Sequence, residues 1–166
     1  MLNTLTSPFF LAGVAIVGAT IFVSCRSGAG HRQPVHLGMQ TVSQGPSSGI
    51  SDETCVAIRS QEELDALWRR HGNLQLPPPQ APAVDFESSI VVGVFLGSRP
   101  SAGYAVEIRG VDHVKSAGEG SPATLVVRAV ESVPMEGAIV AQVTTAPFHL
   151  VMIDGVDGEP ALDLNR

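Results

Sequence analysis

Charged and aromatic side chains are scarce in this chain of 166 residues, in which charged residues make up 16% and aromatic residues 5%. One lysine and nine arginines stand against 16 acidic residues, so the formal net charge is −6 at pH 7. A nucleic-acid-binding surface needs clustered basic residues, together with aromatic residues where bases are stacked. The sequence therefore excludes nucleic acid as an expected partner.

Residues with catalytic or metal-binding chemistry are equally sparse. A cysteine nucleophile needs an activating histidine, and no histidine has a spacing that assigns it to Cys55. We expect Cys55 to be a small buried apolar residue. His71, His113 and His149 lack the spacing of metal ligands, and His149 is expected on a strand, either at its surface or hydrogen-bonded. We expect no enzyme activity, no cofactor and no metal site.

No charged residue occurs before Arg26, and residues 8–23 form a nearly unbroken apolar run. The run lies between the length of a signal-peptide core and that of a membrane-spanning helix. Its end, with Ser24 before Cys25, resembles a bacterial lipobox, in which the cysteine is lipidated. Two interpretations stay open: lipidation at Cys25, or an uncleaved N-terminal helix. We expect an exported, membrane-anchored lipoprotein of the cell envelope, on the periplasmic or surface side. With an uncleaved helix, Arg26 and Arg32 would by the positive-inside rule hold the domain in the cytoplasm.

The chain is predicted to consist of an N-terminal anchor over residues 1–25, a linker and one folded domain. Residues 26–51 are rich in Gly, Ser, Pro and Gln and show no apolar periodicity, which predicts a flexible linker. Within it, Gly45–Gly49 matches G-x-S-x-G, a motif that requires a strand before it and a helix after it. Neither is predicted, so the match is interpreted as chance. The folded domain is expected over residues 52–166.

One helix is predicted in this domain. Ser60 and Glu63 form the pattern of a capping box, so the helix should begin at residue 61. The apolar spacing ends near His71, and Gly72 suits the position after the helix. We expect the single Trp68 to pack this helix against a sheet.

The rest of the domain has the pattern of strands joined by turns, which predicts a mostly β (α+β) domain with an antiparallel, sandwich-like sheet. Residues 90–96 are continuously apolar, as is typical of a central strand. Residues 154–166 are acidic and are expected to form a solvated tail. The further predicted strands cover residues 54–59, 104–109, 124–133, 139–144 and 148–153.

Two segments of this domain resemble the C-terminal domain of the PrcB family, lipoprotein subunits of a protease complex. They are VGVFLGSRPSAGYAVEI, residues 92–108, and VTTAPFHLVMI, residues 143–153. The family has a strand that ends in Gly, a Pro-Thr-Gly-Gly-Tyr turn and a later Thr-x-Pro. The matching residues here are Gly97, Pro100, Ser101, Ala102, Gly103, Tyr104, Thr145 and Pro147.

The resemblance implies a non-enzymatic subunit that binds and stabilises an exported protease. Loops held by a rigid sheet are common binding sites, whereas the same residues can simply form the turn and the core. The candidate partner-binding residues are Arg99, Pro100, Ser101, Gly103, Tyr104, Thr145, Pro147 and Phe148, the last on the expectation that Pro147 interrupts the strand ladder and exposes it.

Two alternatives remain. Chagasin-like inhibitors of cysteine proteases use three loops, to which residues 99–104, 118–121 and 146–148 are similar in order. This resemblance implies a protease inhibitor. The other alternative is a structural envelope lipoprotein without a protease partner.

Overall fold

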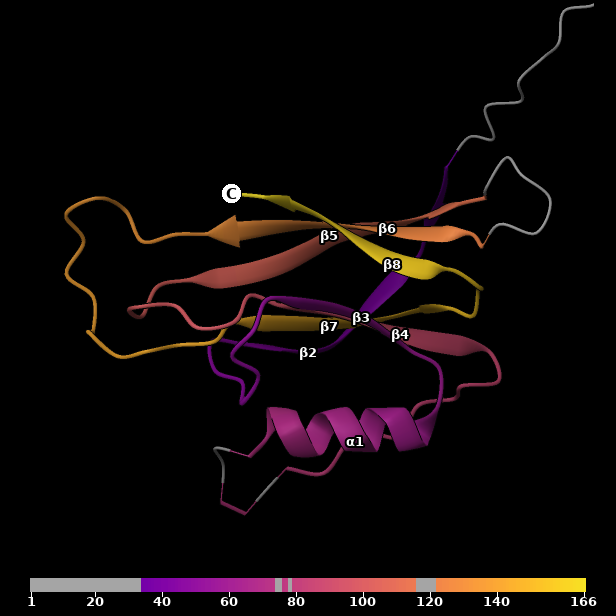
Figure 1. The fold of residues 1–166 in the computed structure, drawn as a ribbon, viewed down its shortest axis with the longest axis horizontal. Coiled ribbons are helices and arrows are strands. Elements are labelled where there is room, and N and C mark those ends of the chain that lie inside the picture. Colours follow the sequence, from indigo (N-terminus) through magenta and orange to yellow (C-terminus); the bar gives the residue numbers. More distant parts are fainter. Residues whose placement is uncertain (1–33, 74–75, 78, 116–121) are drawn as a thin grey trace, which may run out of the picture.

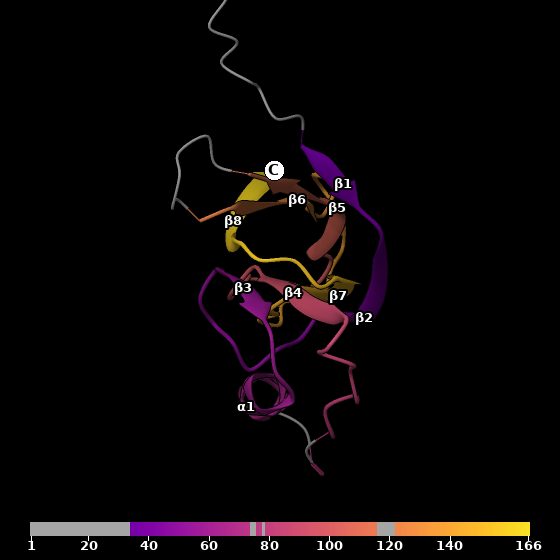
Figure 2. The same cartoon turned by 90° about the vertical axis from the view of Figure 1, so that its right-hand side faces the viewer.

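The computed structural model describes residues 34–73, 76–77, 79–115 and 122–166. They form two four-stranded sheets that lie face to face, and one helix covers the outer face of the second sheet (Figures 1 and 2). The first sheet has the strand order β1-β5-β6-β8, and the second has the order β2-β7-β4-β3. The predicted mostly β fold is confirmed.

The elements follow one another along the chain with a single helix between the third and fourth strands. Their bounds are β1 Val35–Leu37, β2 Met39–Gly45, β3 Thr54–Ile58, α1 Gln61–His71, β4 Ser89–Phe95, β5 Ala105–Val114, β6 Thr124–Ser132, β7 Phe148–Asp154 and β8 Glu159–Asn165.

Strand β4 separates two apolar cores. Val92 and Val94 point into the core between the sheets, whereas Val91 and Phe95 point into the core under α1. Both faces of β4 are therefore buried in apolar cores, because side chains alternate between the two faces of a sheet. This explains the continuous apolar run and confirms the predicted central strand.

Helix α1 begins and ends where the sequence predicts. The Ser60 side chain accepts a hydrogen bond from the Glu63 amide at 3.2 Å, and the Glu63 carboxylate accepts one from the Arg59 amide at 2.8 Å. Trp68 is buried in the core that α1 shares with the second sheet, as expected. Among the residues described, no helix combines the length and the apolar character needed to cross a membrane.

The predicted linker over residues 26–51 is wrong from residue 35 onward, and so is the domain start at residue 52. Strand β1 pairs with β5, and β2 pairs with β7. Both are edge strands in which most side chains are exposed. Because one-sided burial leaves few apolar positions in such strands, the sequence pattern resembles a loop. The predicted anchor over residues 1–25, including Cys25, lies outside the described residues.

Two predictions about the C-terminal half are also wrong. Residues 139–144 form no strand, and the expected solvated tail contains β8, which pairs in parallel with β6. In β8 half-buried residues alternate with exposed ones, and the acidic Glu159 and Asp163 among the exposed residues hid the alternation. The parallel pairing arises because β7 belongs to the other sheet, so the chain crosses over before β8. The remaining strand pairs are antiparallel as predicted.

Candidate protein-binding site

The turn between β4 and β5 lies beside the segment that leads into β7. Arg99 and Thr145 form a mutual backbone pair: the Arg99 amide donates to the Thr145 carbonyl at 2.7 Å, and the Thr145 amide donates to the Arg99 carbonyl at 3.0 Å. The Thr145 hydroxyl also donates to the Ser101 carbonyl at 2.9 Å. Residues 97–104 and 144–148, called the paired segments below, therefore form one unit. The two segments that the sequence singles out are brought together.

The Arg99 side chain fixes this unit to the body of the sandwich. Its Nε donates to Glu131 Oε1 at 2.6 Å, its second terminal nitrogen donates to Oε2 at 3.1 Å, and its Nη1 donates to the Leu96 carbonyl at 2.7 Å. The hydrogen bond to Glu131 raises the pKa of Arg99. Because these donors are used within the chain, Arg99 positions the turn and presents little free charge.

Glu131 is a residue that the sequence reasoning missed. It lies on β6 at the position that continues the buried alternation of Leu125, Val127 and Ala129, and its side chain is only 4% exposed. A carboxylate in a core-facing position needs a charged partner. The alternation of buried residues along β6 was the signal in the sequence that could have identified Glu131 as a core-facing residue. Arg166 also reaches Glu131, with its Nε 3.3 Å from Oε2, and it forms an ion pair with Glu53.

The candidate residues differ in their access to a partner. Pro100 and Gly103 are exposed, and Arg99 and Tyr104 are half-buried. Ser101, Thr145, Pro147 and Phe148 are buried, so they support the site from within and their side chains face no partner.

Phe148 is placed differently from the expectation. Pro147 does not interrupt the hydrogen bonding between the chain segments that continue β4 and β7, because its carbonyl accepts a hydrogen bond from the Leu96 amide at 2.9 Å. The Phe148 ring is 5% exposed and packs on Phe95 and His71, with ring centroids 6.0 Å and 4.2 Å apart. The expected exposure of Phe148 is wrong. An inhibitor that inserts this aromatic ring into a protease cleft is not supported by this burial.

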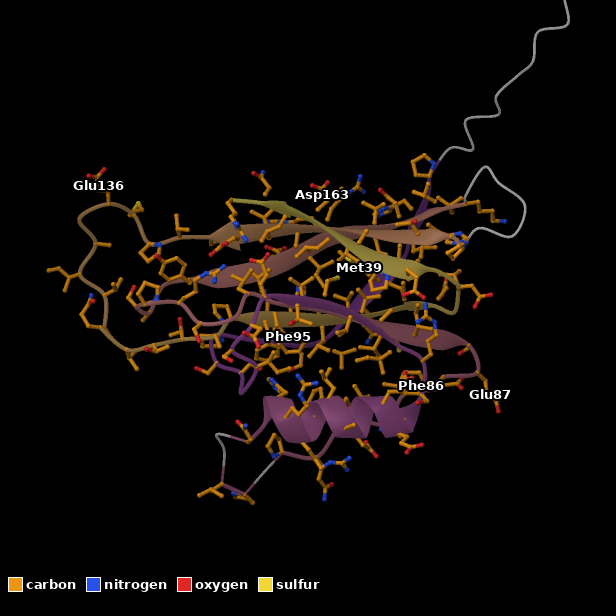
Figure 3. The ribbon with its side chains drawn as sticks, in the orientation of Figure 1. Met39, Phe86, Glu87, Phe95, Glu136 and Asp163 are labelled. Carbon is orange, nitrogen blue, oxygen red and sulfur yellow. The ribbon has the colours of Figure 1, made fainter. Side chains whose placement is uncertain are left out.

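An exposed apolar loop lies against the paired segments. We call residues 133–144 the apolar loop. The exposed fractions are 59% for Val133, 83% for Met135, 103% for Ile139 and 54% for Val143. Figure 3 shows the loop projecting from one end of the sandwich, with Glu136 at its outer edge. The Ala102 amide donates to the Ala141 carbonyl at 2.9 Å, which attaches the loop to the turn.

The buried Ser48 and His71 side chains hold the C-terminal end of α1. The Ser48 hydroxyl lies 3.0 Å from His71 Nδ1 and accepts from the Ile50 amide at 3.1 Å. Burial lowers the pKa of His71. The Ser48–His71 contact is therefore part of the packing at this end of α1, and Ser48 also lines a pocket of about 330 Å³ beside Thr144 and Thr145. In the G-x-S-x-G match the motif serine is Ser47, which is exposed; β2 does end at Gly45, but no helix follows directly, since α1 begins only at Gln61.

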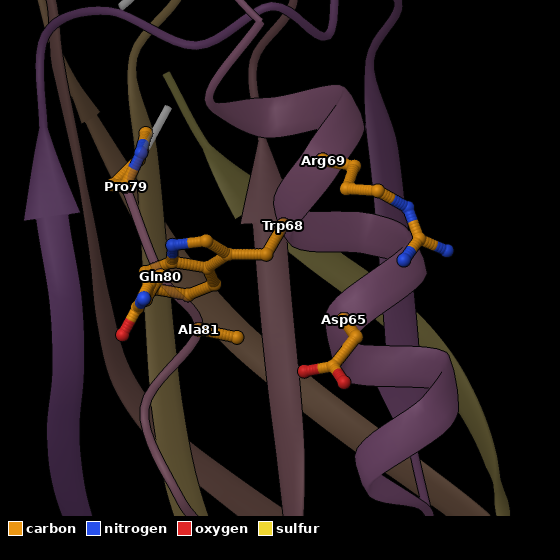
Figure 4. Close-up of a pocket in the computed structure, with 6 residues that line it drawn as sticks. All are labelled: Asp65, Trp68, Arg69, Pro79, Gln80 and Ala81. Atoms are coloured by element: carbon orange, nitrogen blue, oxygen red, sulfur yellow. The ribbon is translucent and has the colours of Figure 1, made fainter. Parts of the chain in front are cut away.

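Cys55 and a pocket beside α1 likewise give no reactive centre. Cys55 packs against the core between the sheets, and burial raises the pKa of its thiol to about 11. A pocket of about 360 Å³ lies where the indole of Trp68 meets residues 79–81 (Figure 4). The Trp68 Nε1 is buried without a partner among the described residues, so the pocket offers no accessible donor there. Within those residues no cluster of three or more His, Cys, Asp or Glu is suited to a metal ion.

The part of the chain that contains the paired segments and the apolar loop matches a known family. Residues 90–154 match the family model described as PrcB C-terminal. The predicted PrcB resemblance is confirmed. The match runs from β4 through β7 and contains every described feature of the candidate site except Glu53 and Arg166. No curated protein and no solved structure shows a significant match to the chain.

Proposed function

We propose that this chain is a non-enzymatic subunit that binds and stabilises a protein partner, an exported protease. The observation that carries the proposal is the PrcB C-terminal match over residues 90–154, because the resemblance implies a subunit of a protease complex. We also propose that Cys25 or the N-terminal helix holds the domain at a membrane of the cell envelope. Under this proposal the β-sandwich supports the binding site, and the partner binds at the end of the sandwich that carries the paired segments and the apolar loop.

The proposed contact surface combines the exposed part of the paired segments with the apolar loop. Pro100, Gly103 and Tyr104 give it a rigid edge, because the Arg99–Thr145 pair and the Arg99–Glu131 ion pair hold the turn. The exposed Met135 and Ile139 give it apolar area. Contiguous exposed apolar residues on a soluble domain mark interaction sites. Recognition through a rigid aromatic and apolar edge needs no reactive residue.

Capture from the chain's own envelope tests the proposal. The full chain is immobilised, and the proteins retained are identified and assayed for proteolysis. We expect a protease to be retained by the wild-type chain and to be lost with Tyr104→Ala. The variant Arg69→Ala, an exposed change on the far side of α1, serves as the control and should retain the protease. Failure to retain any protease would contradict the proposal.

A further inference from the structure

Part of the apolar loop, residues 139–144, leaves its backbone amides without partners among the described residues, although it forms no strand. On the side that faces the turn, the Ala141 carbonyl accepts from Ala102, and Thr145 pairs with Arg99. These two inward residues are four positions apart. In the extended conformation that strand pairing requires, successive residues point to opposite sides. With Ala141 and Thr145 facing the turn, the backbone groups of Val140, Gln142 and Thr144 would then point away from the domain.

The side chains of the same segment favour a strand. Ile139, Val140, Val143 and Thr144 are β-branched, a class enriched in strands. The sequence predicted a strand here, and the structure lacks one because the outer edge has no partner. An exposed edge is usually protected by charged residues or proline. From Gly137 to Thr144 there is neither, so this edge is left open.

We infer that residues 139–144 form a docking edge to which an extended segment of the protein partner adds as a strand. The occupant is neutral and apolar, and it supplies carbonyls to the outward amides of Val140, Gln142 and Thr144. Such strand addition derives affinity from main-chain hydrogen bonds and selectivity from alternate side chains. Here Ile139 and Val143 are the exposed side chains that contact it. The inference rests on the proposed function and names the chemistry of its contact.

Two other occupants are less suited to this edge. A second copy of the chain brings together two molecules that each carry a formal charge of −6. A membrane surface favours Lys, Arg and Trp beside apolar residues, and residues 133–144 contain none of them. In Figure 1 the loop also lies at the opposite end of the sandwich from the indigo start of the described chain, the side on which the proposed anchor joins.

Hydrogen exchange at single-residue resolution tests the inference on the full chain, alone and bound to the captured protease. In the free chain the amides of residues 139–144 should exchange as unprotected amides. In the complex the amides of Val140, Gln142 and Thr144 should slow by about tenfold or more, as expected for amides that gain hydrogen bonds. The amide of Val143, which faces the other side, should slow less. This alternation is the signature of strand addition.

Proline substitution provides the second arm. Gln142→Pro removes an outward amide that donates to nothing in the described chain, so the fold should persist while affinity for the protease falls about tenfold. Gln142→Ala should retain full affinity. Gln80→Pro is the proline control, because Gln80 is exposed in an irregular segment outside the contact surface and its amide bonds no described residue.

The outcomes separate this inference from the proposed function. A captured protease that leaves these amides unprotected, or binds Gln142→Pro as well as wild type, overturns strand addition and leaves the proposed function standing. Protection in the free chain, or on addition of phosphatidylglycerol–phosphatidylethanolamine vesicles, also overturns it in favour of a second copy or a membrane. Failure of the wild-type chain to capture any protease contradicts the proposed function, and this inference with it.

Discussion

The imidazole of His149 connects the two sheets through the backbone of Ile108. Its Nδ1 accepts a hydrogen bond from the Ile108 amide at 2.8 Å, and its Nε2 lies 3.0 Å from the Thr41 hydroxyl. The amide can only donate, so Nδ1 is unprotonated and Nε2 carries the proton that is donated to Thr41. His149 is 3% exposed, which confirms a hydrogen-bonded strand histidine and excludes the surface alternative.

The free energy of unfolding should fall in mild acid because His149 is buried in its neutral form. Burial lowers the pKa of His149, an effect that nearby Glu107 opposes, and burial also lowers the pKa of His71. Below an ordinary histidine pKa of about 6.5, the unfolded chain binds protons that the folded chain does not. The free energy of unfolding is therefore fully present above pH 6.5 and declines as the pH falls toward the folded pKa values. Urea unfolding at pH 7.5 and at pH 5.5 measures this decline.

The variant His149→Asn should have a smaller decline between these two pH values, because the titrating ring is gone. His36→Asn, in which an exposed imidazole is replaced, is the matched control. If wild type and His149→Asn lost the same free energy of unfolding between pH 7.5 and pH 5.5, the buried neutral imidazole would be ruled out as the cause.

The Arg99–Glu131 ion pair should stabilise the chain strongly. Glu131→Gln leaves the partly buried guanidinium without its carboxylate, and breaking such a pair costs about 3 kcal/mol. Urea unfolding of Glu131→Gln at pH 7.5 checks this value. Glu107→Gln, which breaks the exposed pair with Arg109, should cost under about 1 kcal/mol. Equal losses in the free energy of unfolding for the two substitutions would show that burial of the Arg99–Glu131 pair does not increase its contribution to stability.

The Cys55 thiol should react slowly. Its pKa of about 11 instead of 9.0 lowers the thiolate fraction about 100-fold at pH 8, and the thiolate is the reactive form. In the Cys25→Ser chain, carbamidomethylation by iodoacetamide should therefore be at least that much slower in buffer than in 8 M urea. Similar rates in both solutions would mean that Cys55 is accessible and ionised.

Two glycines with positive φ allow a matched comparison of two turns. Gly97 begins the paired segments, and Gly137 lies in the apolar loop. A Cβ at Gly97 would lie 2.5 Å from the Ser51 carbonyl oxygen, whereas a Cβ at Gly137 meets nothing within 4 Å. Gly137→Ala should cost about 1 kcal/mol from backbone strain alone. Gly97→Ala should cost about 1–3 kcal/mol more because of the clash. Thermal unfolding of both variants measures the difference, and a larger loss for Gly137→Ala would contradict the described turn.

Local sequence signals predicted the parts of the fold that depend on one segment at a time. The Ser60–Glu63 capping box gave the start of α1, and the apolar run over residues 90–96 gave β4. Strands β1, β2 and β8 were missed because each has one solvated face, so polar residues interrupt the apolar pattern that marks a buried strand. Residues 139–144 showed the converse error, since strand propensity without a neighbouring strand gives no ladder.

The site was predictable in its location and not in its contacts. The sequence reasoning named Arg99 and Thr145 as candidate contact residues, and the structure joins them through two backbone hydrogen bonds. The burial of Phe148 depends on α1 and β4, which are distant in sequence, so no local pattern reveals it. The pairing of Arg99 with Glu131 likewise depends on the approach of β6 to the turn.

The lifetime of the captured protease shows directly whether binding of this chain stabilises its partner. Its half-life at 37 °C is measured in envelopes that contain the wild-type chain, the Tyr104→Ala chain or no chain. Stabilisation of a folded partner by binding requires that the loss of binding shortens its lifetime. We expect a long half-life with the wild-type chain and a short one both with Tyr104→Ala and without the chain. An equal half-life in all three envelopes would contradict it.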